Sequence, residues 1–262
     1  MDKIAEIRKK INKGDNQIIE LLEERMACLQ EIAALKKADR EALYFPEQDC
    51  NQLNMLMAKF SGSEFEQEFR RIFTEIYMSG AKAQGKAAIP YNIYLIGFMG
   101  AGKSSVASEL ERRLMLDTIE MDQIIVEQTN MSISDIFSKH GEEHFRALET
   151  NLLIQLQQVK HKIVSCGGGV PMRDVNTEQM KKNGRIVLLK ASPETIYERV
   201  KDCKDRPILN DNMNVEFIAS LMEKRRERYE HVADLTVSTD GKSVGQICQE
   251  IIAGLYELDQ QN

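Results

Sequence analysis

Residues 91–104 read YNIYLIGFMGAGKS, an apolar run of strand length that leads directly into a loop with three glycines. Helical spacing of apolar residues begins immediately after this loop. In a strand–loop–helix unit of this kind, backbone N–H groups of the loop and the positive N-terminus of the helix surround phosphate oxygens. The full G-x-x-x-x-G-K-S pattern in this context predicts an α/β domain that binds a nucleotide.

The residues of the loop are expected to share the binding of ATP and Mg²⁺. Lys103 reaches toward the β- and γ-phosphates, and the Ser104 hydroxyl coordinates Mg²⁺. The other positions expected to contact ATP are Gly97, Gly100, Ala101, Gly102 and Ser105. The loop by itself does not reveal which molecule accepts the phosphoryl group.

The remainder of residues 91–262 alternates short apolar runs with helical patterns. Runs with the length of buried strands lie at 93–96, 163–166, 186–189 and 235–237. Helical spacing follows at 103–115, 142–161, 193–201, 215–231 and 243–258. Alternating strands and helices predict a parallel sheet that is covered by helices on both faces.

Apolar residues near the start of the chain recur every three or four positions, from Ile4 and Ile7 to Ile32 and Leu35. This spacing predicts one helix of about nine turns, which needs other helices or a second copy of the chain to cover its apolar face. Helical patterns at 48–60 and 64–84 follow, and the later part of the small-residue segment 80–90 is interpreted as a linker. We therefore expect an all-α domain over residues 1–88 and an α/β domain over residues 91–262.

Composition and charge exclude several classes of protein. A formal net charge of −6 over 262 residues argues against a nucleic-acid-binding protein, which would normally be basic. No apolar run approaches the ~18 residues of a membrane span, and the first residues lack the apolar region of a signal peptide. Five scattered cysteines without a C-x-x-C pair indicate free thiols in a reducing compartment. We expect a cytoplasmic protein that does not bind membranes.

A second group of residues, downstream of the loop, points to the phosphoryl acceptor. The three glycines at 167–169 directly follow an apolar run, and glycines in that place let a ligand approach the backbone closely. Arg146, Arg206 and Arg225 lie on different segments. Separate arginines suit a substrate that carries a carboxylate as well as the phosphate being transferred.

Other charged residues near these positions are assigned structural roles. Arg226 and Arg228 are interpreted as solvated charges on a helix. Glu149 lies one turn after Arg146, and we expect it to pair with that arginine rather than to act as a catalyst.

Residues 91–262 resemble shikimate kinase along essentially their whole length. The resemblance rests on the phosphate-binding loop, on Asp122 in the segment Glu-Met-Asp, on the three glycines and on the arginines. It implies that shikimate is the acceptor, with ATP as co-substrate and Mg²⁺ as the metal ion. An acceptor of another kind, such as gluconate or a nucleoside, is the alternative that the loop alone would leave open.

The same resemblance implies a role for each residue of the acceptor group. Asp122 contacts the shikimate hydroxyl and is the candidate base, and Arg206 is the lid arginine that closes on the transferring phosphoryl group. Arg199 matches the arginine near the adenine, and Glu120 stands where the family usually has an aspartate near the metal. The residues that match the shikimate-binding set are Asp122, Arg146, Gly167, Gly168, Gly169 and Arg225. With Lys103, Asp122 and Arg206 form the implied catalytic set.

Two cations lie on the apolar stripe of the N-terminal helix. Arg25 and Lys36 are eleven residues apart, close to three full turns, and Arg8 lies near the start of the same helix. Cations arranged in this way suit a small dicarboxylate. A solvated basic face or an interhelical salt bridge would give the same pattern.

Residues 1–88 resemble the all-helical class of chorismate mutase, an intertwined dimer whose sites take residues from both chains. The resemblance implies that Gln84 hydrogen-bonds the ether oxygen of chorismate. The full set of implied chorismate-binding residues is Arg8, Arg25, Lys36, Asp49 and Gln84. Three positions depart from the family, since Phe45 replaces an aspartate, Gln48 an arginine and Gly80 a serine.

The two resemblances together predict a bifunctional enzyme of aromatic amino-acid biosynthesis. One activity phosphorylates shikimate with ATP, and the other rearranges chorismate to prephenate. The predicted assembly is a homodimer that forms through the helical domain. The alternative, favoured by the three departures, is a shikimate kinase whose helical domain only regulates or dimerises.

Overall fold

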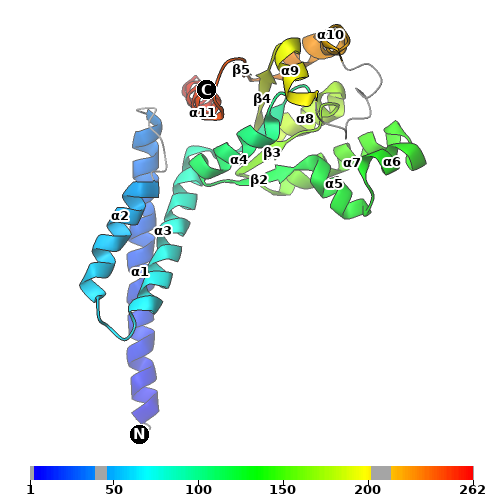
Figure 1. The fold of residues 1–262 in the computed structure, drawn as a ribbon. Helices are drawn as coiled ribbons and strands as arrows, with labels where there is room; N and C mark the ends of the chain where they lie inside the picture. Colours follow the sequence, from blue (N-terminus) through cyan, green and yellow to red (C-terminus); the bar gives the residue numbers. More distant parts are fainter. Residues whose placement is uncertain (1–2, 39–45, 202–213, 262) are drawn as a thin grey trace. The chain divides into compact units, whose positions relative to one another are not determined.

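The chain divides into two units of different architecture, Met1–Ala88 and Ile89–Asn262, which we call the helical unit and the sheet unit. The computed structural model describes residues 3–38, 46–201 and 214–261 (Figure 1). Its first unit consists of helices, and its second surrounds a parallel sheet with helices. The predicted fold class, an all-α region followed by an α/β domain, is confirmed.

Five parallel strands form the sheet in the order β2-β3-β1-β4-β5. The strands are β1 (Asn92–Ile96), β2 (Asp117–Glu120), β3 (Lys162–Ser165), β4 (Gly184–Lys190) and β5 (Leu235–Ser238). All five residues of β1 are buried, as expected for a central strand covered on both faces. The sequence predicted four of these strands. It missed β2, an edge strand of four residues in which Ile119 is the one strongly apolar side chain.

The strand order creates a crevice at the carboxyl ends of β1 and β3. From β1 the chain crosses over to β2 on one side, and from β3 it crosses over to β4 on the other side. Neighbouring strands whose connections leave in opposite directions form the usual ligand crevice of open α/β sheets. Leu95 and Glu120 both pair in register with Ser165, so the loops after β1, β2 and β3 emerge at the same edge.

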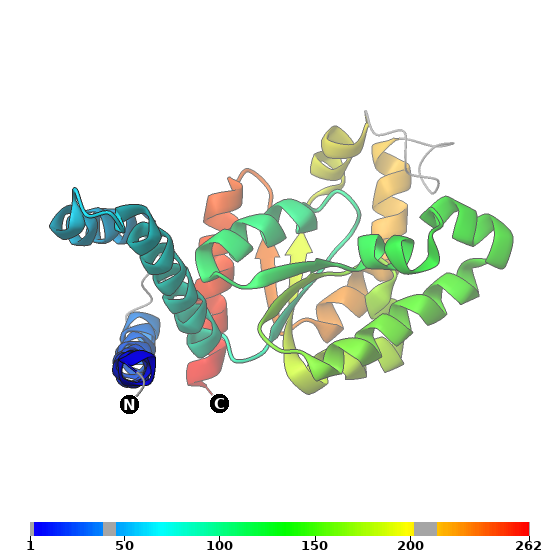
Figure 2. The same ribbon diagram turned by 90° about the horizontal axis from the view of Figure 1, so that it is seen from below.

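Helices cover both faces of the sheet (Figure 2). Right-handed crossovers take α4 to one face and α8 to the other, and α11 packs beside α4 while α7 packs beside α8. The helices of this unit are α4 (Lys103–Leu114), α5 (Met121–Thr129), α6 (Ile133–His140), α7 (Glu142–Gln155), α8 (Asp174–Asn183), α9 (Pro193–Val200), α10 (Val215–Val232) and α11 (Val244–Gln260). Short 3₁₀ turns, η2 (Leu156–Gln158) and η3 (Val170–Met172), follow α7 and β3. The helix predicted over 142–161 therefore ends earlier than expected, at Gln155.

The helical unit contains α1 (Lys3–Ala38), α2 (Pro46–Met57), the 3₁₀ turn η1 (Ala58–Phe60) and α3 (Glu66–Ala88). The first and third helices run parallel, because Arg25 donates to the Ile76 carbonyl and Lys37 to the Ala88 carbonyl. The segment interpreted as a linker is helical as far as Ala88, and that interpretation was wrong. The small residues of α3 that are buried are Gly80, Ala81, Gly85 and Ala88.

The long apolar stripe of α1 is uncovered in a single chain. Ala33 is the one buried residue among those described in this helix. Ile4, Ile18 and Leu35 are 57%, 55% and 66% exposed, and the rest of the stripe is similar. Within the described residues, no helix combines the length and the apolar character of a membrane span.

Candidate active site

The phosphate-binding loop leads directly into α4 (Figure 1). Lys103 and Ser104 are the first two residues of this helix. The Lys103 ammonium donates to the carbonyl oxygens of Gly97 and Phe98 at 3.0 and 3.2 Å. The loop is closed by a bond from the Ala101 N–H to the Phe98 carbonyl. The lysine is thus held at the mouth of its own loop, with its charge beside the helix N-terminus that attracts phosphate.

One cavity of about 1080 Å³ joins this loop to the predicted acceptor residues. From the predicted ATP-binding set, its lining includes Gly100, Gly102, Lys103, Ser104, Ser105 and Arg199. From the predicted acceptor set, it includes Asp122, Arg146, Gly167, Gly168, Gly169 and Arg225, and Glu120 also lines it. Gly97 and Ala101 are not part of this lining, and Arg206 lies outside the described residues. The fold therefore brings the predicted ATP-binding residues and the predicted acceptor residues, which are distant in sequence, to one cavity.

Arg146 is clamped by two carboxylates on its own helix, α7. Its guanidinium bonds Glu149 and Glu142, each at 2.8 Å. The predicted pairing with Glu149 is confirmed. The guanidinium lies directly against the glycine run, where a Cβ at Gly169 would collide with it. The arginine thus has a fixed position beside backbone that a substrate can approach.

Glu149 is fully buried, which the sequence did not indicate. Its Oε2 accepts from Arg146, whereas Oε1 has no hydrogen-bond partner among the described residues. A Cβ at Gly167 would lie 2.7 Å from Glu149 Oε1 and 3.1 Å from Asp122 Oδ1, so these two carboxylates meet at the glycine run. Burial raises the pKa of Glu149, with Arg146 opposing the shift and the Asp122 charge adding to it.

Helix α10 contributes Arg225 and Tyr229 from one face. The Arg225 guanidinium lies 5.7 Å from the centre of the Phe98 ring, within the range of a cation–π contact. The Tyr229 hydroxyl donates to the Gly168 carbonyl at 2.5 Å. Burial raises the pKa of Tyr229, which keeps this donor protonated. Sequence reasoning missed Tyr229, although its spacing of four residues from Arg225 places it on the same face.

Arg228 also holds the glycine run, and its interpretation as a solvated charge was wrong. Its Nε donates to the Pro171 carbonyl at 2.8 Å, and its guanidinium pairs with Asp174 at 2.6 Å. These bonds join α10 to the turn η3 that follows the glycines and to the first residue of α8. Arg226 remains exposed and pairs with Glu223, so the same interpretation is confirmed for Arg226.

Arg199 joins the phosphate-binding loop to the segment after β5. Its guanidinium donates to the Gly100 carbonyl at 3.2 Å and to the Thr239 hydroxyl and carbonyl at 3.1 and 3.3 Å. Phe137 and Phe145 give the cavity an apolar wall, with ring centres 5.0 Å apart, and the Arg146 guanidinium lies 5.4 Å from the centre of the Phe145 ring. The cavity therefore combines cations with an apolar wall from α6 and α7.

In the helical unit, Arg25 is held against α3. Its guanidinium lies 5.0 Å from the centre of the Tyr77 ring and donates to the Ile76 carbonyl at 3.4 Å. A Cβ at Gly80 would lie only 2.6 Å from the Arg25 guanidinium, so the missing side chain makes room for the arginine. Gln84 follows one turn later, and its buried Oε1 has no hydrogen-bond partner within the described parts of the chain.

The other predicted cations of this unit lie in different turns of α1 from Arg25. Arg8 is exposed and precedes Arg25 by 17 positions on the same straight helix, a separation of about 25 Å. Lys36 lies eleven positions beyond Arg25, or about 16 Å along the axis. Gln48 and Asp49 fall in α2 with side chains outside the described part, and Phe45 lies outside the described residues altogether. A single chain therefore does not assemble the full predicted set.

Comparisons with known families agree with the division into two parts. The family model of shikimate kinase matches residues 99–256. The family model of chorismate mutase type II matches residues 7–85.

Individual relatives and solved structures match the sheet unit. The shikimate kinase of Caldanaerobacter subterraneus subsp. tengcongensis is 37% identical over 167 residues, which cover 64% of this chain and 97% of the relative. The shikimate kinase of Thermodesulfovibrio yellowstonii is 40% identical over 161 residues, which cover 62% of this chain and 92% of the relative. The structure of shikimate kinase from Acinetobacter baumannii in complex with shikimate is 31% identical with a TM-score of 0.60, covering 66% and 94%. That of shikimate kinase from Aquifex aeolicus is 34% identical with a TM-score of 0.58, covering 65% and 99%. The chain belongs to the shikimate kinase family, and a chorismate mutase type II region precedes its kinase region.

Proposed function

We propose that the chain is a bifunctional enzyme that phosphorylates shikimate with ATP and rearranges chorismate to prephenate. For the kinase activity, the observation that carries the proposal is the single cavity that Lys103, Asp122, Arg146 and Arg225 share. Phosphoryl transfer depends mainly on positioning and on stabilising negative charge. The cavity provides fixed cations for both purposes.

In this proposal the two arginines at the glycine run hold the carboxylate of shikimate. Arg146 is held rigid by Glu149 and Glu142, and Arg225 by its contact with Phe98. Asp122 then accepts the proton of the attacking hydroxyl, and Lys103 stabilises the charge that develops on the transferring phosphoryl group. Arg199 lies beside the adenine, and Arg206 closes over the phosphoryl group.

The same cavity fits Mg²⁺. Ser104 and Glu120 both line it, and hydroxyl and carboxylate oxygens are ligands that Mg²⁺ prefers. Mg²⁺ in phosphotransferases is usually held by one or two protein groups together with substrate phosphates. When bound, the ion would neutralise charge on the β- and γ-phosphates. Ser104 would be its direct ligand, and Glu120 would orient its water ligands.

An acceptor panel tests the kinase activity. ATP-dependent phosphorylation should be fast with shikimate and absent with gluconate and nucleosides. Asp122→Asn should lower kcat by about 10²-fold or more, because the hydroxyl proton loses its acceptor. Asp117→Asn is the matched control and should retain activity, because it changes an exposed carboxylate at the start of β2, the strand that leads to Asp122. Absence of any shikimate-dependent turnover would overturn the proposal.

For the mutase activity we propose a site that two chains build together. The rearrangement needs a fixed substrate conformation and positive charge near the breaking ether bond, and Arg25, Lys36 and Gln84 would provide both. Because Arg8 lies about 25 Å from Arg25 along one helix, the Arg8 of a second chain would complete the site. The exposed stripe of α1 supports this dimer, since a second copy would cover it.

A regulatory or purely dimerising helical unit is the second candidate. One contact favours it, because α3 already engages the Arg25 guanidinium through Tyr77 and the Ile76 carbonyl. A mutase assay on the intact chain separates the two candidates. Chorismate should be converted to prephenate, and Arg25→Ala should abolish conversion while Arg71→Ala, at an exposed position of α3, should not. Chorismate binding without turnover would establish the second candidate.

Cytoplasmic localisation stays a prediction from the sequence. Fractionation of cells that express the full chain, with detection of shikimate-dependent ADP release in each fraction, would test it.

A further inference from the structure

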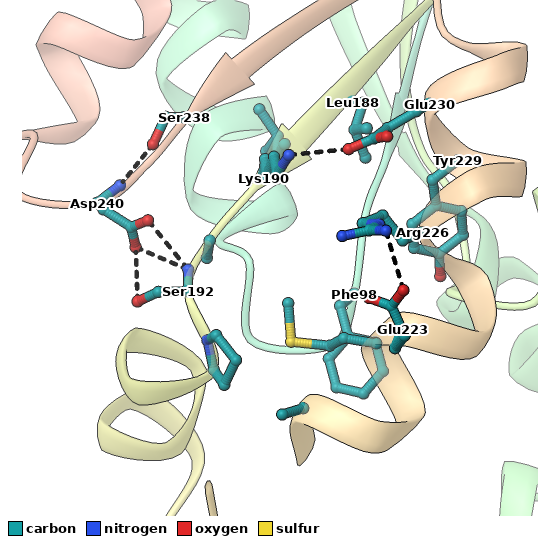
Figure 3. A pocket seen from close by; sticks show the side chains of 15 residues that line it. Phe98, Leu188, Lys190, Ser192, Glu223, Arg226, Tyr229, Glu230, Ser238 and Asp240 are labelled. Carbon is teal, nitrogen blue, oxygen red and sulfur yellow. Dashed lines mark hydrogen bonds and ion pairs between the residues drawn. The ribbon is translucent and has the colours of Figure 1, made fainter. Parts of the chain in front are cut away.

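A second cavity of about 570 Å³ lies beneath α10, beside the carboxyl end of β4 (Figure 3). Its interior is apolar, with Phe98 from the phosphate-binding loop, Leu188 from β4, and Ala219 and Met222 from α10 among its lining. Small-molecule sites usually have volumes of about 300–1,000 Å³ and apolar walls with a few polar groups. The cavity meets both criteria, and the kinase chemistry described above does not use it.

Charged residues of alternating sign stand at the edge of this cavity. Lys190 pairs with Glu230 at 2.8 Å, and Arg226 pairs with Glu223 at 2.9 Å (Figure 3). The two pairs belong to one cluster, because the hydrogen bond from Lys190 lowers the pKa of Glu230 and the Arg226 charge adds to this effect. All four side chains keep substantial exposure, so an incoming ligand can reach them.

The balance of charge decides what kind of ligand fits. Asp240 also lines the cavity, which gives three carboxylates and two cations in all. A phosphate or a dicarboxylate would meet net repulsion there. A zwitterion would avoid this repulsion, since its carboxylate can pair with the cations while its ammonium pairs with the carboxylates.

We propose that this cavity binds a free α-amino acid with a large apolar or aromatic side chain. The side chain fills the apolar interior against Phe98 and Met222. The amino and carboxylate groups remain at the charged edge, where Glu230 and Glu223 accept from the ammonium and Lys190 and Arg226 donate to the carboxylate.

The wall between this cavity and the kinase cavity consists of residues that act on both sides. The Phe98 ring lies against Arg225, and the Phe98 carbonyl accepts from Lys103. Tyr229 lines the second cavity and donates to the Gly168 carbonyl. A ligand that packs on Phe98 and Tyr229 is therefore linked to the acceptor site. The link to shikimate as the acceptor rests on the proposed function. Binding of the amino acid to the second cavity does not depend on it.

Calorimetric titration of the full-length chain tests the binding. The probes are L-phenylalanine, L-tyrosine and L-tryptophan, with 3-phenylpropanoate and phenethylamine as analogues that each lack one charged group. We expect at least one amino acid to bind, and both analogues to bind about tenfold more weakly or worse, because each leaves one side of the cluster without a partner. Binding of none of the amino acids, or equal binding of an analogue, would overturn the proposal.

Two pairs of variants locate the site. Ala219→Phe fills the cavity and should abolish binding, while Ser220→Phe, the next residue on the exposed side of α10, should not. Arg226→Gln should weaken binding about tenfold, while Lys224→Gln should leave it unchanged. Thermal unfolding of each variant checks folding, and the glutamine pair decides the matter if Ala219→Phe does not fold. Binding that survives both cavity variants would contradict this location.

Linkage tests the connection to the kinase cavity. The Kd of the amino acid should change when shikimate is present, and the affinity for shikimate should change by the same factor when the amino acid is present. This mutual change in affinity should disappear in Ala219→Phe and persist in Ser220→Phe. An amino-acid Kd that is identical with and without shikimate would overturn the connection.

Discussion

The sheet unit and the helical unit differ in how much of their apolar surface one chain can cover. In the sheet unit every residue of β1 is buried, and helices close both faces. In the helical unit the buried apolar residues among those described are Ala33, Met57, Ala81 and Ala88, three of them alanines. The isoleucines and leucines of α1 stay exposed instead.

This difference extends to the two sites. The kinase cavity collects its residues from β2, β3, six helices and the loops after β1 and β3, all in one unit, so one chain is sufficient for its described part. In the helical unit, Arg8 and Arg25 lie about 25 Å apart along one helix, and in our proposal the Arg8 of a second chain completes the site. In this proposal, the unit with a covered core holds its site within one chain, and the unit with an uncovered stripe shares its site between two chains.

The largest expected effect separates the two activities. Lys103→Ala removes the cation of the phosphate-binding loop, and kcat for shikimate phosphorylation should fall by about 10³-fold or more. Mutase turnover should be unchanged, because the helical unit keeps all its residues. An ADP-release assay and the absorbance of chorismate measure the two rates on one preparation. Loss of both activities would show that the units are not independent.

A charge on the exposed stripe should break the dimer next. Ile18→Glu buries an uncompensated carboxylate in the proposed dimer contact, which costs about 3 kcal/mol or more, or about 10²-fold in the dimer Kd. Light scattering should show a monomer with little mutase activity and full kinase activity. Ile154→Glu is the control, since this isoleucine of α7 is 48% exposed and lies in the sheet unit. A wild-type chain that is already monomeric would refute the dimer.

A smaller effect is expected inside the kinase cavity. Glu149→Gln weakens the buried clamp on Arg146, and the KM for shikimate should rise about tenfold through loss of a charge-assisted hydrogen bond. Glu142→Gln changes the exposed partner of the same arginine, and the KM should move by less than about twofold. Equal effects of the two variants would show that burial of Glu149 does not matter for binding.

Glu149 also predicts a dependence of stability on pH. Because burial raises its pKa above the ordinary value of 4.5, the folded protein retains a proton that the unfolded chain has already released. The contribution of Glu149 to the free energy of unfolding therefore falls as pH rises above 4.5, which is the opposite of the usual behaviour of a paired carboxylate. Glu149→Gln cannot ionise, so the stability of wild type relative to this variant should decline over the same range in denaturant titrations. A constant difference would contradict the raised pKa.

The smallest expected effect concerns the contact between α10 and the glycine run. Arg228→Gln removes the bonds to Pro171 and Asp174, which should lower the free energy of unfolding by about 1–2 kcal/mol and raise the KM for shikimate about twofold. Lys224→Gln, on the exposed side of the same helix, should change neither quantity. Urea titration and shikimate kinetics measure both. If Arg228→Gln changes neither the stability nor the KM, Arg228 is a solvated charge after all.

Local patterns in the sequence were sufficient for most of the elements. The phosphate-binding loop, four of the five strands and α1 follow from spacing and glycine placement, because backbone geometry repeats over short distances. Strand β2 was not predicted because its four residues include one strongly apolar side chain, too few to show an alternation of apolar and polar residues. The later part of the segment 80–90 was misinterpreted as a linker because glycines and alanines are typical of linkers, whereas here small residues permit close packing of α3 against α1.

Of the kinase site, the sequence indicated the residue types and the family, but not which charges are buried. Arg226 and Arg228 are two positions apart on one helix, and only the position of η3 makes one a solvated charge and the other a structural anchor. Glu149 is buried because α7 packs against the glycine run, which lies close to it in space and distant in sequence.

The sequence by itself determined that this chain has a nucleotide-binding α/β unit after a helical one, since motifs and periodicity are properties of neighbouring residues. Only the tertiary structure decided that Asp122, Arg146 and Arg225 share a cavity with Lys103, that a second cavity lies behind Phe98, and that the stripe of α1 is left uncovered. The physical reason is that burial, and the charges and distances that depend on it, arise from contacts between segments that are remote along the chain.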